Sequence, residues 1–328
     1  MTDKAWSGVP VVVTGGAGFI GSNLALRLAG LGASVTVVDR MLAEYGANPY
    51  NLTAAGKQVK IIEADIGDDG ATETAISTAA FIFNLAGQTS HMDSMRQPLE
   101  DLQLNQEANL RLLELVRRSN PGARLIFSST RQFYGTPRYL PVDENHPIAP
   151  PDINGIHKFA AESYHLLYAR VYGLRATALR LTNVFGPRMR IRDAKQGFLG
   201  IWIRHAIQDS AFDVWGGEQR RDFTFVDDLV DAMLLTAGAE NTVGNAYNIG
   251  GCPPLSLLEL AELLVRTAGA GRYERREFPP ERKKIDIGDY YSDDSAFRSA
   301  TGWQPATGLA DGLARTLDYY RTHGAHYL

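Results

Sequence analysis

The sequence is poor in three features, and each shortage excludes a class of protein. It has one cysteine, Cys252, so it can form neither an intramolecular disulfide nor a multi-cysteine metal site, and we expect no metal and a reducing compartment, the cytoplasm. No apolar run reaches the roughly 18 residues that cross a bilayer, and the first residues show no leader pattern. The formal net charge of −4 gives no overall positive field. We therefore expect no membrane and no nucleic-acid partner.

Short β-branched runs alternate with amphipathic stretches through the first half of the 328-residue chain. Buried parallel strands are short and apolar, whereas helices repeat their apolar residues every 3.6 positions, so this alternation predicts βαβ units. The fold class is therefore α/β, with a doubly wound parallel sheet. The expected strands are residues 11–14, 35–38, 59–63, 81–85, 125–128 and 177–181, and the clearest helices are residues 23–31, 105–118 and 158–172.

The pattern becomes less regular after Gly186 and Pro187. A basic loop follows, then helical stretches at residues 198–208, 257–267 and 309–320, with a Pro- and charge-rich connector at residues 278–284. We expect residues 1–182 to form a nucleotide-binding domain. Residues 183–328 should form mainly a smaller α/β substrate domain, partly interleaved with the first, that closes over a ligand at the carboxyl ends of the strands.

A glycine-rich turn lies between the first expected strand and the first expected helix, at residues 15–21. Glycines at such a turn let the backbone approach a pyrophosphate, whose charge meets the free N–H groups of the helix N-terminus. Asp39 closes the second strand, where a carboxylate can bind the adenosine ribose and repel a 2′-phosphate. This predicts a Rossmann fold that binds NAD rather than NADP, although the neighbouring Arg40 favours a phosphate. On position alone, Asp65 and Ile66 border the adenine or form a turn.

Several later segments, taken in order, resemble the extended short-chain dehydrogenase/reductase family of NAD-dependent nucleotide-sugar epimerases and dehydratases. The resemblance covers nearly the whole chain and implies NAD as cofactor, a nucleotide sugar as substrate, and a homodimer. Leu102, Leu112, Leu113, Leu115, Val116, Leu166 and Leu167 can supply the dimer contacts or simply pack in the core. The matching segments are residues 14–21, 65–66, 84–87, 128–130, 133–135, 155–162, 183–187 and 221–223, with Asp227.

The resemblance also implies roles for individual residues. Thr130 would share the substrate hydroxyl, and Lys158 would bind the nicotinamide ribose. The remaining cofactor-binding residues would be Gly15, Gly18, Phe19, Ile20, Gly21, Asp39, Asp65, Ile66, Leu85, Ala86, Gly87 and Ser128. The substrate-binding residues matched to the family are Asn183, Arg221, Lys283 and Asp286, and the further candidates are His91, Arg131 and, from the charge of the basic loop, Arg188.

The sequence departs from this family at one position, four residues before Lys158. The family carries a catalytic tyrosine there, and this chain has Asn154. An amide can position a hydroxyl but cannot accept its proton near neutral pH. Three interpretations are open. Another group accepts the proton, or the protein binds cofactor and sugar nucleotide without catalysing a reaction. Alternatively, the catalytic tyrosine has been deliberately replaced by asparagine. The candidate acceptors are Thr130, Tyr134, Asp152, Lys158, His91 and, less well placed on its helix, His157.

The residues after Thr130 bear on the reaction. Family members that eliminate water or decarboxylate carry carboxylates just past this position, whereas this chain has Arg131 and Gln132. Because neither side chain titrates usefully, elimination is disfavoured and epimerisation at C4 is the default hypothesis. Residues 85–88, 128–130 and 245–251 also resemble C2-epimerases of CDP-deoxysugars, so both reactions remain open. Arg131 would hold a substrate carboxylate or phosphate, or form a surface ion pair.

Overall fold

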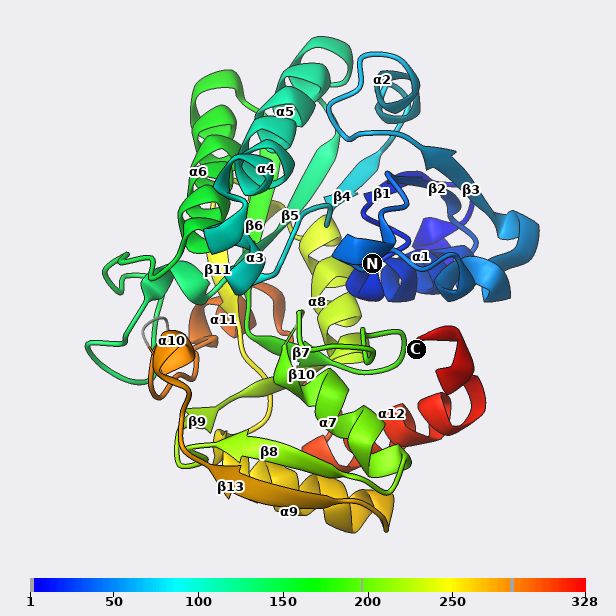
Figure 1. The fold of residues 1–328 in the computed structure, drawn as a ribbon. Helices are drawn as coiled ribbons and strands as arrows, with labels where there is room; N and C mark the ends of the chain where they lie inside the picture. The colour runs from blue at the N-terminus through cyan, green and yellow to red at the C-terminus, as the bar shows by residue number, and fades with distance from the viewer. Residues whose placement is uncertain (1–2, 196, 284–285) are drawn as a thin grey trace.

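A seven-stranded parallel sheet forms the centre of the larger lobe (Figure 1). The computed structural model describes residues 3–195, 197–283 and 286–328, so the connector's Lys284 lies outside the described residues. The strand order is β11-β6-β5-β4-β1-β2-β3, with strands added on both sides of β1, which confirms the predicted doubly wound fold. The strands are β1 (Pro10–Thr14), β2 (Ser34–Asp39), β3 (Val59–Glu63), β4 (Phe81–Asn84), β5 (Arg124–Thr130), β6 (Arg175–Leu181) and β11 (Ala246–Ile249).

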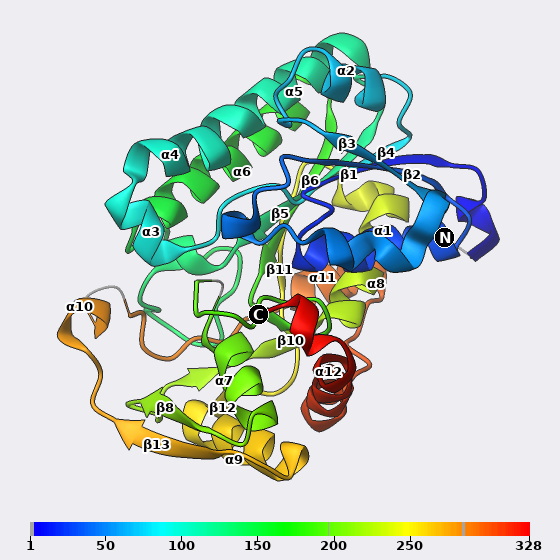
Figure 2. The same cartoon turned by 45° about the vertical axis from the view of Figure 1, so that its right-hand side comes forward.

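Helices cover both faces of this sheet, with α1 and α8 on one face and α5 and α6 on the other (Figure 2). Because both faces are covered, the central strand β1 is apolar on both sides, and Val11, Val12 and Val13 are all buried. The helices are α1 (Phe19–Gly30), α2 (Ala71–Ile76), α3 (His91–Arg96), α4 (Pro98–Leu102), α5 (Ala108–Ser119), α6 (Ile153–Tyr172), α8 (Val226–Gly238) and α11 (Ser295–Thr301).

The smaller lobe packs three helices against a two-stranded parallel sheet (Figure 1). Its apolar core includes Trp202, Phe212, Leu260 and Leu313. Two further strand pairs, β7 with β10 and β9 with β12, complete this half of the chain. The elements are β7 (Asn183–Phe185), α7 (Phe198–Ile207), β8 (Ala211–Trp215), β9 (Arg220–Arg221), β10 (Phe223–Phe225), β12 (Leu255–Ser256), α9 (Leu257–Ala268), β13 (Arg272–Arg276), α10 (Pro280–Lys283) and α12 (Leu309–His323).

The chain crosses between the lobes several times after residue 183. Helix α8 and strand β11 lie in the larger lobe, where β11 pairs with β6 from Ala246 opposite Ala178 onward. Near the chain's last residue, the Tyr327 hydroxyl donates to Asn51 Oδ1 at 2.6 Å, and this bond ties the tail back to the larger lobe. Much of the region assigned to the second domain is therefore built into the first.

The leucines considered for a dimer contact lie mostly in the core. Leu112, Leu113 and Leu115 are at most 1% exposed, so the structure favours core packing for them rather than an interface. Helix α6 does keep apolar side chains on its surface, including Leu167 and Val171. The homodimer remains a prediction. Within the described ranges, no helix is long and apolar enough to span a membrane.

Helix α6 begins earlier than the sequence pattern predicts, at Ile153 instead of residue 158. Asp152 caps it, because its Oδ1 accepts a hydrogen bond from the Gly155 N–H at 2.7 Å. Asn154 and Lys158 are consequently both helical and four residues apart, which places them on one helix face. That face is turned toward the cavity described next.

Candidate active site

A cavity of about 1400 Å³ lies at the carboxyl ends of the parallel strands and is lined by both lobes. It brings together most of the residues that the sequence singled out. Among the residues predicted to bind cofactor or substrate, Arg188 and Lys283 are the two exceptions. The predicted residues in its wall are Gly15, Gly18, Phe19, Ile20, Gly21, Asp39, Asp65, Ile66, Leu85, Ala86, Gly87, His91, Ser128, Thr130, Arg131, Asn154, Lys158, Asn183, Arg221 and Asp286.

The glycine turn forms one end of this cavity. Gly15 has a φ of +68°, and a Cβ there would lie 2.8 Å from the Ala86 backbone. A Cβ on Gly21 would lie 2.3 Å from the Gly15 carbonyl oxygen. Gly18 is the N-cap of α1, and a Cβ there would lie 3.3 Å from its nearest neighbour, the Gly15 carbonyl oxygen. Gly18 therefore leaves open space over the helix N-terminus. The turn is shaped to bring backbone N–H groups against a pyrophosphate.

Asp39 lies at the end of β2 with its carboxylate against the backbone. Its Oδ2 accepts from the Ala17 N–H at 3.0 Å and its Oδ1 from the Met41 N–H at 2.8 Å. Burial raises the pKa of Asp39 despite these two hydrogen bonds. Arg40 lies 3.4 Å from Asp65 Oδ2, so its guanidinium has a carboxylate neighbour instead of being left for a 2′-phosphate. Both features favour NAD over NADP.

Replacing Asp39 by asparagine is expected to lower the affinity for NAD and to reduce the preference for NAD over NADP. A hydrogen bond to a charged group is worth about 1.5–3 kcal/mol, which corresponds to roughly 10- to 150-fold in affinity. The affinity for NADP should fall less than the affinity for NAD, because the 2′-phosphate of NADP no longer meets a negative charge. Isothermal titration calorimetry with both cofactors measures the ratio of the NAD and NADP affinities, with the variant Asp68→Asn, at an exposed position, as control. An unchanged NAD/NADP ratio would show that Asp39 does not face the ribose.

Lys158 is buried in the cavity wall rather than solvated on its helix. Its ammonium lies 5.3 Å from the centre of the Phe127 ring and beside Gly87, where a Cβ would come within 2.9 Å of Nζ. Burial lowers the pKa of Lys158 to about 8, with the Asp101 charge acting in the opposite direction. Glu162, one turn further along, instead pairs with Arg180 at 2.6 Å. Lys158 thus presents its ammonium to the cavity.

Asn154 is fixed by hydrogen bonds on its amide nitrogen. Nδ2 donates to the Gln88 carbonyl oxygen at 2.9 Å and to Asp101 Oδ2 at 3.1 Å. Both neighbours are acceptors, so the nitrogen must face them, and Oδ1 is the remaining polar atom. Asp101 also contacts His157 Nδ1 at 2.6 Å. Sequence reasoning missed Asp101, because a carboxylate in the first turn of a helix is ordinary and only the packing of α4 against α6 reveals this contact.

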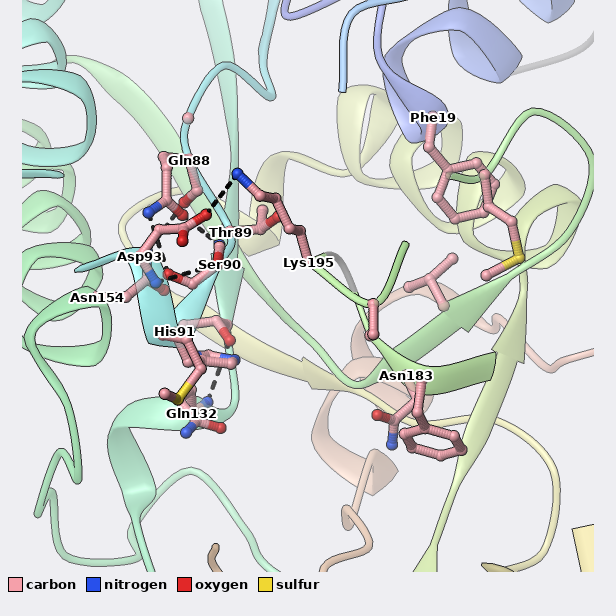
Figure 3. Close-up of a pocket in the computed structure, with 18 of the residues that line it drawn as sticks. Phe19, Gln88, Thr89, Ser90, His91, Asp93, Gln132, Asn154, Asn183 and Lys195 are labelled. Atoms are coloured by element: carbon pink, nitrogen blue, oxygen red, sulfur yellow. Dashed lines mark hydrogen bonds and ion pairs between the residues drawn. The ribbon is translucent and has the colours of Figure 1, made fainter. Parts of the chain in front are cut away.

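His91, Gln132 and Asp152 form a second polar cluster. Gln132 Nε2 donates to Asp152 Oδ2 at 2.9 Å, and His91 Nδ1 lies 3.0 Å from the same oxygen, without the alignment of a full hydrogen bond. Burial would raise the pKa of Asp152, but His91, the Gly155 N–H and Gln132 together hold it below its usual range. His91 and Gln132 lie on one side of the cavity and Asn183 on the other (Figure 3).

Two arginines form the wall near Asn183. Arg131 Nη1 is buried without a hydrogen-bond partner among the described residues, while Nη2 contacts Asn183 Oδ1 at 3.4 Å. The guanidinium lies over the Tyr290 ring, 4.8 Å from its centre, and burial lowers the pKa of Arg131. Arg221 is 3.3 Å from Asp286 Oδ1. A buried guanidinium with an open N–H suits an anionic group of the substrate. The surface ion pair considered for Arg131 is not what the structure shows.

Replacing Arg131 by methionine is expected to weaken binding of the nucleotide sugar that the family resemblance implies roughly 10- to 150-fold without lowering the free energy of unfolding. The loss follows from about 1.5–3 kcal/mol for a hydrogen bond to a charged group. Stability should be kept, because replacing a poorly compensated buried charge by an apolar side chain is often neutral or stabilising. Titration calorimetry and urea unfolding check the two parts. A variant that binds normally but unfolds more easily would make Arg131 a structural residue.

Several candidate residues lie outside the cavity wall. The Arg188 guanidinium donates to Asn23 Oδ1 at 2.8 Å and lies over the Tyr319 ring, so it joins the lobes and does not line the cavity. Lys283 is exposed at the end of α10. Tyr134 is buried with its hydroxyl donated to Asn248. His157, bound to Asp101, does not line the cavity either.

The glycine cradle, the carboxylate at the end of β2 and the buried lysine at the ends of a doubly wound sheet define a dinucleotide-binding protein of the Rossmann class. Comparison with known sequences is more specific. The model of the NAD dependent epimerase/dehydratase family matches residues 11–250, and the chain belongs to that family. This confirms the resemblance described above. NAD is the cofactor, as predicted.

Similar proteins include both curated sequences and solved structures. A UDP-glucose 4-epimerase of Mycolicibacterium smegmatis is 32% identical over 312 residues, covering 94% of this chain and 98% of that protein. The structure of UDP-glucose 4-epimerase with UDP-glucose from Thermotoga maritima has a TM-score of 0.86 at 31% identity, covering 95% of this chain and 99% of that one. MoeE5 in complex with UDP-glucuronic acid and NAD has a TM-score of 0.82 at 27% identity, with the same coverage.

Proposed function

We propose that this protein is an NAD-dependent nucleotide-sugar epimerase that inverts C4 of the sugar through a transient ketone. The observation that carries the proposal is the wall beside Thr130, which presents Arg131 and the amide of Gln132. The nearby carboxylate, Asp152, has a lowered pKa and is therefore a poor proton donor. Protonating a leaving hydroxyl requires an acid, so this wall disfavours elimination. The UDP-glucose 4-epimerases similar to this chain support the same reaction.

Each part of the wall has a role in this reaction. When bound, NAD would supply a reversible hydride acceptor for the sugar carbon. Lys158 holds the ribose of the cofactor and adds positive charge beside it. Thr130 positions the sugar hydroxyl, while Arg131 and Arg221 bind anionic groups of the substrate. The ketone must rotate before reduction, and a cavity of about 1400 Å³ leaves room for that movement.

The test is a panel of UDP-, CDP-, GDP- and dTDP-sugars incubated with the protein and saturating NAD in deuterated water. We expect a C4 epimer of one sugar without deuterium at any carbon, because the same hydride is returned. A C2 epimer would replace this proposal by the CDP-deoxysugar reaction. If the protein binds the nucleotides but forms no isomer of any sugar, the proposal would be replaced by a protein that binds NAD and nucleotide sugars without catalysis.

A further inference from the structure

Oxidising the sugar requires a proton acceptor that Asn154 cannot provide. The hydroxyl carbon loses a hydride to NAD⁺, the O–H electron pair becomes the second bond of the ketone, and the proton must go to a base. Both N–H groups of Asn154 are already donated, to Gln88 and Asp101, and its remaining oxygen is an amide oxygen. A positioned general base is worth about 10²–10⁴ in rate, so an active epimerase needs a substitute.

Only some of the candidate bases reach the cavity. Tyr134, Asp152 and His157 are not part of its wall. The Thr130 hydroxyl lies in the wall and accepts from the Gln132 N–H at 3.1 Å, but an alcohol is too weak a base to keep a proton. Lys158 is mostly protonated at neutral pH, since its pKa is about 8. His91 is the remaining candidate, and imidazole is the usual general base near pH 7.

The distance of 3.0 Å between His91 Nδ1 and Asp152 Oδ2, although not aligned as a full hydrogen bond, indicates which ring nitrogen of His91 carries the proton. An ionised carboxylate only accepts hydrogen bonds, so Nδ1 facing Asp152 Oδ2 at 3.0 Å carries the proton of the neutral ring. Nε2 is then the free acceptor. Asp152 also caps α6, the helix that carries Asn154 and Lys158. The same carboxylate therefore relates the position of His91 to the positions of Asn154 and Lys158. Figure 3 shows His91 below Asn154 on the same side of the cavity.

We propose that His91 Nε2 accepts the hydroxyl proton during sugar oxidation and returns it during reduction, with Asp152 as the positioning residue. This inference rests on the proposed epimerase function. In the forward half-reaction the sugar is oxidised and NAD⁺ reduced, the proton moves to Nε2, and the imidazolium is stabilised by the adjacent carboxylate. In the second half-reaction the ketone regains the hydride and its oxygen regains the proton, so both groups return to their starting state.

The first experiment measures cofactor reduction in a single turnover, using the sugar nucleotide that the wild-type holoenzyme converts. We expect His91→Ala to reduce the rate about 10²–10⁴-fold with NAD binding unchanged, and free imidazole to raise the variant's rate at least tenfold. His91→Gln should be equally slow but not rescued, because its side chain fills the space. The exposed His326→Ala is the control, expected to be unaffected with or without imidazole.

A second measurement does not depend on turnover. Nitrogen-15 spectra of the histidines should show neutral His91 protonated at Nδ1 in the wild type, and at Nε2 in Asp152→Asn, where asparagine still caps α6. The inference would be overturned if His91→Ala reduced the cofactor at the wild-type rate, or if imidazole did not restore the rate that this variant had lost. It would also be overturned if the spectra showed neutral His91 of the wild type protonated at Nε2. Failure of the wild type with every sugar would instead overturn the proposed function, and this step with it.

Discussion

Lys158→Met is expected to lower the rate of cofactor reduction about 10²–10³-fold while making the cofactor-free protein more stable at neutral pH. The rate falls because a fixed positive charge beside the reacting centre is typically worth that factor. The stability gain follows from the location of Lys158, whose ammonium is buried against Phe127 and Gly87. Methionine keeps much of the side-chain volume and removes the charge.

The stability gain should depend on pH in a defined direction. The pKa of Lys158 falls from 10.5 in the unfolded chain to about 8 in the folded one. Between these values the unfolded chain holds a proton that the folded protein has released, so the stability of the wild type rises with pH. Below pH 8 both states are protonated, and the wild type bears the full cost of burying the ammonium. Each tenfold difference in proton affinity between the two states corresponds to about 1.4 kcal/mol.

Urea unfolding of the cofactor-free proteins at several pH values measures this effect. We expect the advantage of Lys158→Met over the wild type to be largest below pH 8 and to shrink toward pH 10.5. Lys57→Met, at an exposed position, should show no such trend. An advantage of the same size at both ends of this pH range would mean that Lys158 is not desolvated in the folded protein.

The second large effect is expected at the glycine turn, where two substitutions separate folding from cofactor binding. In Gly21→Ala the new Cβ would lie 2.3 Å from the Gly15 carbonyl oxygen and 2.8 Å from the Gly16 Cα. These are backbone atoms, so the turn must open. We expect a loss of about 1–3 kcal/mol in the free energy of unfolding, although alanine normally stabilises a helix relative to glycine by about 1 kcal/mol. NAD binding should be lost.

Gly18→Ala is the matched variant. Gly18 has an ordinary φ of −76°, and its Cβ would meet only the Gly15 oxygen, at 3.3 Å. Thermal unfolding without cofactor should therefore stay close to the wild type. NAD affinity should still fall by at least about tenfold, because the methyl group occupies the space over the helix N-terminus. Normal NAD binding by Gly18→Ala would place the pyrophosphate elsewhere.

The fold was largely predictable because its central strands are buried on both faces. Residues 11–14 were predicted as a strand, and β1 covers Pro10–Thr14 with Val11, Val12 and Val13 all buried, since an apolar β-branched run between turn residues has few other uses. Strand β13 was missed for the opposite reason. Its five residues, Arg272–Arg276, are all exposed and mostly charged, so no apolar pattern marks them.

The site was predictable where it is local in sequence and not where it depends on packing. The glycine turn and Asp39 follow from one strand–turn–helix unit. The contact between His91 and Asp152 joins residues far apart in the sequence, so it became visible only when α3 packed beside the start of α6. Arg188 was assigned to the substrate from charge alone, yet it is held by Asn23 on α1. A charged side chain in a loop does not reveal its direction.

The crossing of the chain between its lobes limits how it can be dissected. Strand β11, from the second half of the sequence, occupies the outer edge of β6 from Ala178 to Leu181. A fragment that stopped at residue 182 would leave the N–H and C=O groups of that edge unpaired, and unpaired edges recruit strands from other molecules. Such a fragment would tend to aggregate rather than fold as an isolated cofactor-binding module, so the two lobes must be produced as one polypeptide.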